Sequence, residues 1–134
     1  MDFENCTEEV QQIIENTFDI VCRCKSRYIM PEDMLYAMTF NRNFIECFEK
    51  NGGSTDELRM ELMEFIRDNG ECAKTDDDIR VTEDFGEMFA RAEVETQIGG
   101  REKIDLAHIF SAMMSLEESH AVYFLLKQNV DLLE

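Results

Sequence analysis

The first chemistry that the sequence suggests is calcium binding, because the acidic run at 76–81 begins with three consecutive aspartates. A calcium loop between two helices needs an oxygen ligand at its fifth position and a glycine at its sixth. Arg80 and Val81 stand at these two positions. The run therefore predicts a solvated acidic linker and no calcium site.

The other reactive residues form no catalytic pattern. The segment 99–103 contains two glycines but lacks the GxxxxGK[ST] spacing that holds a nucleotide phosphate, so it predicts a helix stop and a turn. His108 and His120 fall on different predicted helices, outside any HExxH motif. No serine stands in a GxSxG context, and no cysteine has a histidine placed beside it. We expect a non-catalytic chain without a cofactor or a metal.

The cysteines indicate a reducing compartment. There are five, an odd number, at positions 6, 22, 24, 47 and 72, and the sequence has no signal peptide and no long apolar run. We therefore expect a cytoplasmic protein with reduced thiols. Cys22 and Cys24 are two apart on a predicted helix and point to different sides, which makes a poor metal pair. A structural role is expected for all five.

Composition limits the class of protein and its partners. The 134 residues are enough for one domain with its own core, and 44% of them are hydrophobic. One proline and six glycines are too few for a sheet protein. The formal net charge of −17 disfavours nucleic acid and anionic membranes as partners. It leaves two interpretations open, protein partners (basic ones among them) or solubility alone.

Apolar residues recur at helical spacing along most of the chain. Thr7, Asn41 and Asp105 are candidate N-caps, as is either Ser54 or Thr55, and Pro31 suits the first position of a helix. The predicted helices cover about 7–25, 31–40, 42–51, 55–67, 82–98 and 117–128, with an extended link at 26–30 and the start of a further helix at 130–134. A further predicted helix, capped by Asp105, carries Ile109, Phe110 and Met113.

The two halves of the sequence repeat each other. A shift of 75 residues lays Val10 on Phe85, Ile29 on Ile104, and the run 34–38 on 109–113. With two residues inserted in the next loop, Ile45 falls on Val122 and Phe48 on Leu125. Two copies of one helical unit can bury their apolar faces against each other.

We predict an all-α fold, a pseudo-twofold double repeat of four-helix units with seven to eight helices. Residues 1–134 form a single domain, with repeat one at about 7–67, an acidic linker at about 68–81, and repeat two at about 82–134. The second repeat ends before its fourth helix. This favours a fragment of a longer protein or a trimmed stand-alone unit.

Two motifs, in order and at the repeat spacing, point to a known family. The segment 27–38 resembles the "TEHLLLAL" signature of the Clp N-terminal repeat, and 110–127 resembles "IFSEQESQAAYLLRKH" of the ClpA branch. The resemblance extends from about residue 7 to the end of the chain. It implies a mobile, non-catalytic domain above an AAA+ ATPase ring that docks protein substrates and a ClpS-type adaptor, which delivers proteins to the ClpP protease.

The resemblance also implies partner-binding residues. The acidic position of the signature falls on Glu32, and the basic positions of the first helix of the second repeat fall on Glu87 and Arg91, where Glu87 reverses the charge. Arg27 replaces an acidic residue. From the residues alone, Glu32 could instead favour the helix dipole in a first turn, and Arg91 could pair with Glu87 or with Glu95.

Two other functions stay open at this stage. One is a ClpC-like domain that reads phosphoarginine; the second repeat has Leu106-Ala107-His108 where its pocket needs an acidic residue, so only a site near Glu32 and Asp33 is compatible. The other is a free-standing helical adaptor or regulator outside any ATPase.

Overall fold

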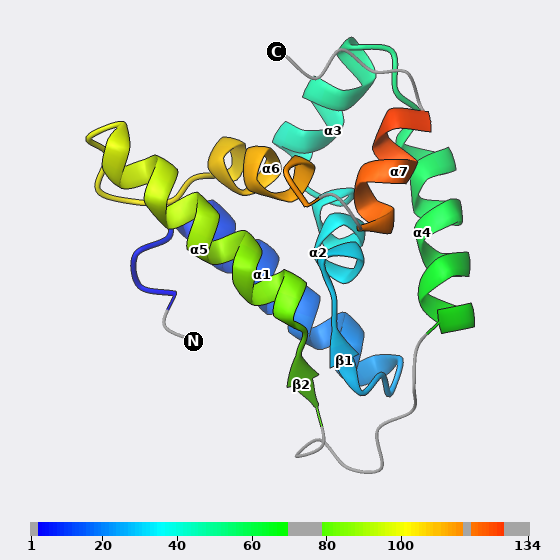
Figure 1. Ribbon diagram of the computed structural model, residues 1–134. Helices are drawn as coiled ribbons and strands as arrows, with labels where there is room; N and C mark the ends of the chain where they lie inside the picture. The colour runs from blue at the N-terminus through cyan, green and yellow to red at the C-terminus, as the bar shows by residue number, and fades with distance from the viewer. Residues whose placement is uncertain (1–2, 70–78, 117–118, 128–134) are drawn as a thin grey trace.

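The computed structural model describes residues 3–69, 79–116 and 119–127, and all statements below concern these residues. They form seven helices and two very short strands (Figure 1). The all-α prediction is confirmed. The elements are α1 Glu8–Arg23, β1 Tyr28–Ile29, α2 Pro31–Met38, α3 Arg42–Lys50, α4 Thr55–Asn69, β2 Arg80–Val81, α5 Glu83–Ile98, α6 Leu106–Met114 and α7 His120–Lys127.

Short polar side chains begin most of these helices. The N-caps of α1, α3, α5 and α6 each accept a hydrogen bond from the backbone N–H three residues on, and they are Thr7, Asn41, Thr82 and Asp105. Ser54 precedes α4, and its hydroxyl accepts from the N–H of Glu57. Pro31 is the first residue of α2. The predicted caps Thr7, Asn41 and Asp105 are confirmed, Ser54 is the one that acts at α4, and Thr82 is a cap that the sequence analysis did not name.

Two crossed backbone contacts relate the halves. Ile29, in the link of the first repeat, pairs in parallel with Val81, just before α5. Ile104, in the link of the second repeat, forms a parallel bridge with Cys6, just before α1. The shift of 75 residues converts one pair into the other. The link of each repeat therefore pairs with the segment that leads into the long helix of the other repeat, as a pseudo-twofold fold requires.

The core centres on α2. This helix contacts α1, α4, α5 and α7 (Figure 1), and seven of its eight residues are buried. Its counterpart α6 has only three buried residues among nine, Ile109, Ala112 and Met113. Helix α4 packs on α2, whereas no helix among the described residues takes the equivalent place on α6. That difference leaves Leu106 and Phe110 partly exposed.

The structure corrects several sequence-based boundaries. α4 continues to Asn69, so residues 68–69 are helical and not linker. Arg80 and Val81 form a strand because the link at 28–29 offers them backbone partners. α7 begins at His120 rather than at 117. The aspartates at 76–78 and the helix expected from residue 130 lie outside the described residues.

The thiols differ from the expectation of a shared structural role. Cys6 is fully buried against the second repeat, whereas Cys22, Cys24 and Cys47 are exposed and free. Cys22 lies in the last turn of α1 and Cys24 is the C-cap of this helix, and both are exposed to solvent. Their position on a helix was therefore not enough to predict that they are buried. Cys72 lies outside the described residues. None of the described helices combines the length and apolar character needed to cross a membrane.

Candidate functional site

Glu32 lies in the first turn of α2, directly after Pro31. Its side chain is not on the surface, because the residue is only 5% exposed. The Oε1 atom accepts two hydrogen bonds, one from the hydroxyl of Ser119 and one from the backbone N–H of His120, both at 3.0 Å. The carboxylate therefore caps the start of α7 from the other repeat.

The start of α7 is also held by stacking. The His120 ring stacks on Phe65 of α4, with centroids 4.5 Å apart. Phe65 makes an edge contact with Phe124, one turn further along α7. Lys127 at the end of α7 donates to Glu61 of α4 at 3.1 Å. These contacts fix α7 along α4, with its first N–H aimed at Glu32.

Glu87 and Arg91 lie on the exposed side of α5. Their side chains are 51% and 41% exposed, and an Arg91 nitrogen lies 2.7 Å from Oε1 of Glu87. Arg91 also donates to the backbone carbonyl of Ser115 at 2.7 Å and to its hydroxyl at 2.8 Å. Of the two partners left open from the sequence, Arg91 takes Glu87; Glu95 instead accepts from Ser111 at 3.4 Å.

Two of the three predicted binding residues hold one segment, and the third, Glu87, pairs with Arg91. Arg91 holds Ser115, the C-cap of α6, and Glu32 holds Ser119, the residue before α7. The connection between α6 and α7 is thus fastened at both ends, from α5 on one side and from α2 on the other. Arg91 and Glu87 contribute exposed charge beside it, and Glu32 supports it from inside the fold.

Asp33, next to Glu32, is the most unusual carboxyl group in the structure. It is 1% exposed, and its Oδ2 accepts from the N–H of Met30 at 2.8 Å while Oδ1 has no hydrogen-bond partner. Burial raises the pKa of Asp33 to about 7; the Met30 hydrogen bond opposes this rise, and the charge of Glu32 adds to it. A carboxyl with one buried oxygen left unpaired is better tolerated when it is neutral.

An open groove of about 350 Å³ separates the exposed sides of α1 and α2. Its apolar wall includes Ile20, Tyr36 and Phe40, and its rim carries Asp19 and Arg23. The ring of Phe40 is 53% exposed and packs edge-on to Tyr36. The groove offers apolar contact area with both signs of charge at its edge.

Sequence reasoning predicted Glu32, Glu87 and Arg91 as binding residues but did not predict Ser115 and Ser119, which Arg91 and Glu32 hold. Ser115 and Ser119 carry no sequence signal of a long-range partner. A capping signal existed at Ser119, because a serine directly before an apolar run is a typical helix start. The partners could not be assigned, because the bonds join residues far apart in the chain.

The histidines serve helix starts. His108 in α6 lies 2.8 Å from the Asp105 carboxylate through its Nδ1, at the N-cap of its own helix, and His120 begins α7. Within the described ranges, no group of three or more His, Cys, Asp or Glu residues is placed to hold a metal ion.

This architecture is that of a small helical double-repeat domain, with surface grooves and an exposed charged pair on α5. Solved structures share the fold. They include the N-terminal domain of Hsp104 from Candida albicans (TM-score 0.78, 13% identity, 96% of this chain and 85% of that one). They also include the N-terminal domain of the chaperone ClpD from Arabidopsis thaliana (TM-score 0.76, 14% identity, 98% of this chain and 90% of that one). A third is the N-terminal domain of the ClpV1 ATPase from E. coli EAEC (TM-score 0.70, 14% identity, 96% of this chain and 82% of that one).

The family follows from the sequence itself. Residues 5–128 match the model of the Clp repeat (R) N-terminal domain, and the chain belongs to that family. Such domains are non-catalytic, regulatory parts of AAA+ ATPases and generally bind adaptors or substrates. No curated protein matches the sequence.

Proposed function

We propose that this chain docks protein substrates and a ClpS-type adaptor for a ClpA-like unfoldase, which passes unfolded proteins to ClpP in the cytoplasm. The observation that carries the proposal is the exposed Glu87–Arg91 pair beside the α6–α7 connection, the segment that resembles the ClpA branch. Charged, half-exposed side chains fixed by hydrogen bonds lose little freedom when a partner binds.

The three candidate residues have different parts in this docking surface. Glu87 and Arg91 are accessible and would contact the adaptor. Glu32 is 5% exposed, so it acts as a positioning residue that keeps the α6–α7 connection in place through Ser119. Glu87 has the opposite charge to the family's residue at this position. The adaptor that fits best is therefore one that has co-varied and carries a basic group opposite Glu87.

A ClpC-like reading of phosphoarginine is less well supported. Glu32 and Asp33 are the only carboxylates that could serve such a site in the first repeat, and both are buried. Glu32 is already engaged by two donors, so a ligand guanidinium would have to displace Ser119 and His120.

Titration of the chain with a ClpS-type adaptor from the same source tests the proposal. We expect saturable binding that Arg91→Ala weakens at least fivefold. Arg42→Ala is the matched control, because Arg42 also pairs with a glutamate one turn away but on α3. No binding at high micromolar adaptor removes the adaptor role. Equal binding by the Arg91 and Arg42 variants removes the site assignment.

A double charge swap sharpens the test. Glu87→Arg combined with Arg91→Glu keeps opposite charges one turn apart but exchanges their positions. We expect the helices to form as in the parent chain, the two Arg91–Ser115 hydrogen bonds to be lost, and adaptor binding to be lost. The gene sequence after the codon of Glu134 tests whether the domain belongs to an ATPase. A Walker motif downstream supports the unfoldase, and a stop codon directly after Glu134 supports the free-standing adaptor.

A further inference from the structure

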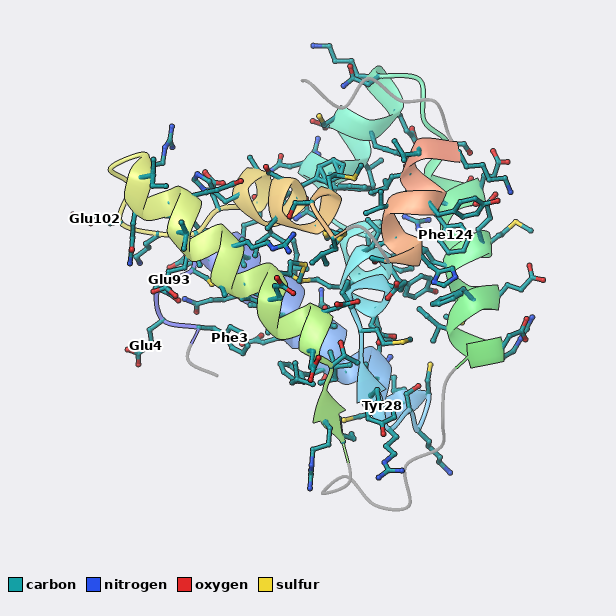
Figure 2. The ribbon with its side chains drawn as sticks, in the orientation of Figure 1. Phe3, Glu4, Tyr28, Glu93, Glu102 and Phe124 are labelled. Carbon is teal, nitrogen blue, oxygen red and sulfur yellow. The ribbon has the colours of Figure 1, made fainter. Side chains whose placement is uncertain are left out.

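A second pocket lies at the opposite side of α5 from the pairing with Ser115, against the N-terminal segment. It is an open hollow of about 530 Å³. Phe3 and Ala90 provide its accessible apolar surface, and Phe89 and Ile104 lie buried behind it, 7% and 2% exposed. Asn5 adds an amide, and Gly86 and Glu93 of α5 complete the lining. In Figure 2, Phe3 and Glu93 are seen on the same side of the molecule, with Glu4 beside Phe3.

The walls of the pocket are firmly built. Phe3 packs on Phe89 with centroids 5.3 Å apart and on Phe18 of α1 at 6.3 Å. The N–H of Ile104 donates to the carbonyl of Asn5 at 2.8 Å, next to the Cys6–Ile104 bridge. The aromatic wall is therefore tied to both repeats, and the hollow is a preformed feature of the fold.

Glu93 is the only charged residue among the described residues that line the pocket. It is exposed and lines the open side of the pocket. An aromatic face with a carboxylate at its edge suits a cation at the end of an apolar stem, because the ring attracts the cation and the carboxylate pairs with it. Arginine and lysine side chains have this shape.

We propose that this pocket receives an unmodified arginine or lysine side chain from a basic, extended segment of a client protein. The stem lies along Phe3 and Ala90, and the charged end pairs with Glu93. The net charge of −17 draws such segments toward the domain over a distance, and the pocket selects the side chain once it arrives. This site is separate from the adaptor surface at Arg91 and does not depend on it.

The charges near the pocket favour a cationic occupant. Glu4 lies on the N-terminal segment beside Phe3, and Glu102 lies in the turn before Ile104 (Figure 2). Of the basic residues in that turn, Arg101 is 3.8 Å from the Asp105 carboxylate. Lys103 is the remaining positive charge there. The acidic groups outnumber the basic ones around the opening, as charge complementarity with a basic segment requires.

The test uses the complete 134-residue chain, labelled with ¹⁵N, and a blocked hexapeptide, Ac-Gly-Ser-Leu-Arg-Leu-Gly-NH₂. We expect saturable amide shifts confined to the N-terminal segment, α5 and Ile104, with affinity that falls as salt is added. The same peptide with citrulline in place of arginine, which keeps the shape and removes the charge, should bind at least fivefold more weakly.

Three variants locate the binding. Glu93→Gln removes the charge, and Ala90→Leu fills the hollow from an exposed position on a helix; each should weaken the arginine peptide at least fivefold with an otherwise unchanged spectrum. Glu49→Gln, an exposed glutamate on α3, makes the same change in net charge and should have no effect.

Three results would overturn the proposal. They are equal binding of the citrulline peptide, equal weakening by Glu49→Gln and Glu93→Gln, and the absence of shifts at millimolar peptide. None of them bears on adaptor binding at Arg91, which is measured with a different ligand and different variants.

Discussion

Glu32 of the first repeat accepts a hydrogen bond from the backbone N–H of His120 in the second repeat, at 3.0 Å. A residue expected to face a partner protein thus faces the other half of its own chain. The same oxygen accepts from Ser119. The start of α7, the last described helix, therefore depends on a side chain contributed by α2, the most deeply buried helix.

Replacing Glu32 should loosen this junction. Glu32→Ala leaves the hydroxyl of Ser119 and the N–H of His120 without their acceptor, and we expect a loss of about 1–3 kcal/mol in the free energy of unfolding. Glu32→Gln keeps an acceptor oxygen and should lose less. Urea unfolding gives the stability, and hydrogen exchange at His120 and Ala121 gives the local effect.

The control for that comparison is Glu49→Ala at an exposed position on α3, which should stay within about 0.5 kcal/mol of the parent chain. If Glu32→Ala is as stable as this control and His120 keeps its exchange protection, the junction does not depend on the carboxylate.

Asp33 should make stability depend on pH. Its pKa is about 7 in the folded chain and 3.8 in a solvated reference, so the folded state holds the proton more tightly. Stability from this group is fully present below about pH 4, falls as the pH rises from 4 to 7, and is level above 7. The Asp33→Asn variant should lack this pH-dependent loss of stability. Its free energy of unfolding should therefore rise relative to that of the parent chain from pH 5 to pH 8.

Urea unfolding at pH 5, 6, 7 and 8 measures the difference between Asp33→Asn and the parent chain. Asp19→Asn, at an exposed position on α1, is the control and should show a constant difference. A constant difference for Asp33→Asn as well would show that the carboxyl is ionised in the folded chain throughout this range.

Gly53, between α3 and α4, should not tolerate a side chain. A Cβ atom there would overlap the ring of Phe48, which is 3% exposed and stacked on Phe44. Gly53→Ala must displace this ring, and we expect a loss of about 1–3 kcal/mol. Thermal unfolding measures it. Gly99→Ala is the control. A Cβ atom there would lie 3.4 Å from the carbonyl oxygen of Glu95, and the backbone of Gly99 is in the right-handed helical region.

Gly99→Ala should leave stability unchanged or slightly raise it, since alanine restricts the unfolded chain more than glycine does. A pair of variants with equal melting temperatures would mean that Phe48 moves aside without cost.

The thiols should separate by reactivity in the folded state. Cys22, Cys24 and Cys47 are exposed, so iodoacetamide should modify them within the native chain. Cys6 is fully buried beside Ile104 and should react only after unfolding in urea. Peptide mass spectrometry reads each position separately. Modification of Cys6 at the rate of Cys47 would show that the N-terminal segment leaves the second repeat readily.

Much of the fold could be predicted from the sequence because its signals are local. The caps at Thr7, Asn41 and Asp105 and the apolar stripes depend on residues within one or two turns. The repeat was detectable because both halves carry apolar residues at equivalent positions of the same order of helices. The shift of 75 residues also relates the Ile29–Val81 pair to the Cys6–Ile104 pair.

The candidate site was predictable only in part. Arg91 is one turn from both Glu87 and Glu95, so helix geometry predicted a pairing on α5 but did not choose Glu87. The burial of Glu32 does not, because it results from α7 packing over α2 from a distant part of the chain. The pocket at Phe3 had no sequence signal, since its walls come from three separated segments.

The crossed contacts of Cys6 with Ile104 and of Ile29 with Val81 also determine how the domain responds to mechanical force. Tension applied at the N-terminus acts first on the second repeat, through Ile104, before it reaches the first turn of α1. Neither half can be pulled away without opening both contacts. Because the Cys6–Ile104 contact closes a loop that spans most of the chain, we expect it to form late in folding and to hold the two halves together under tension.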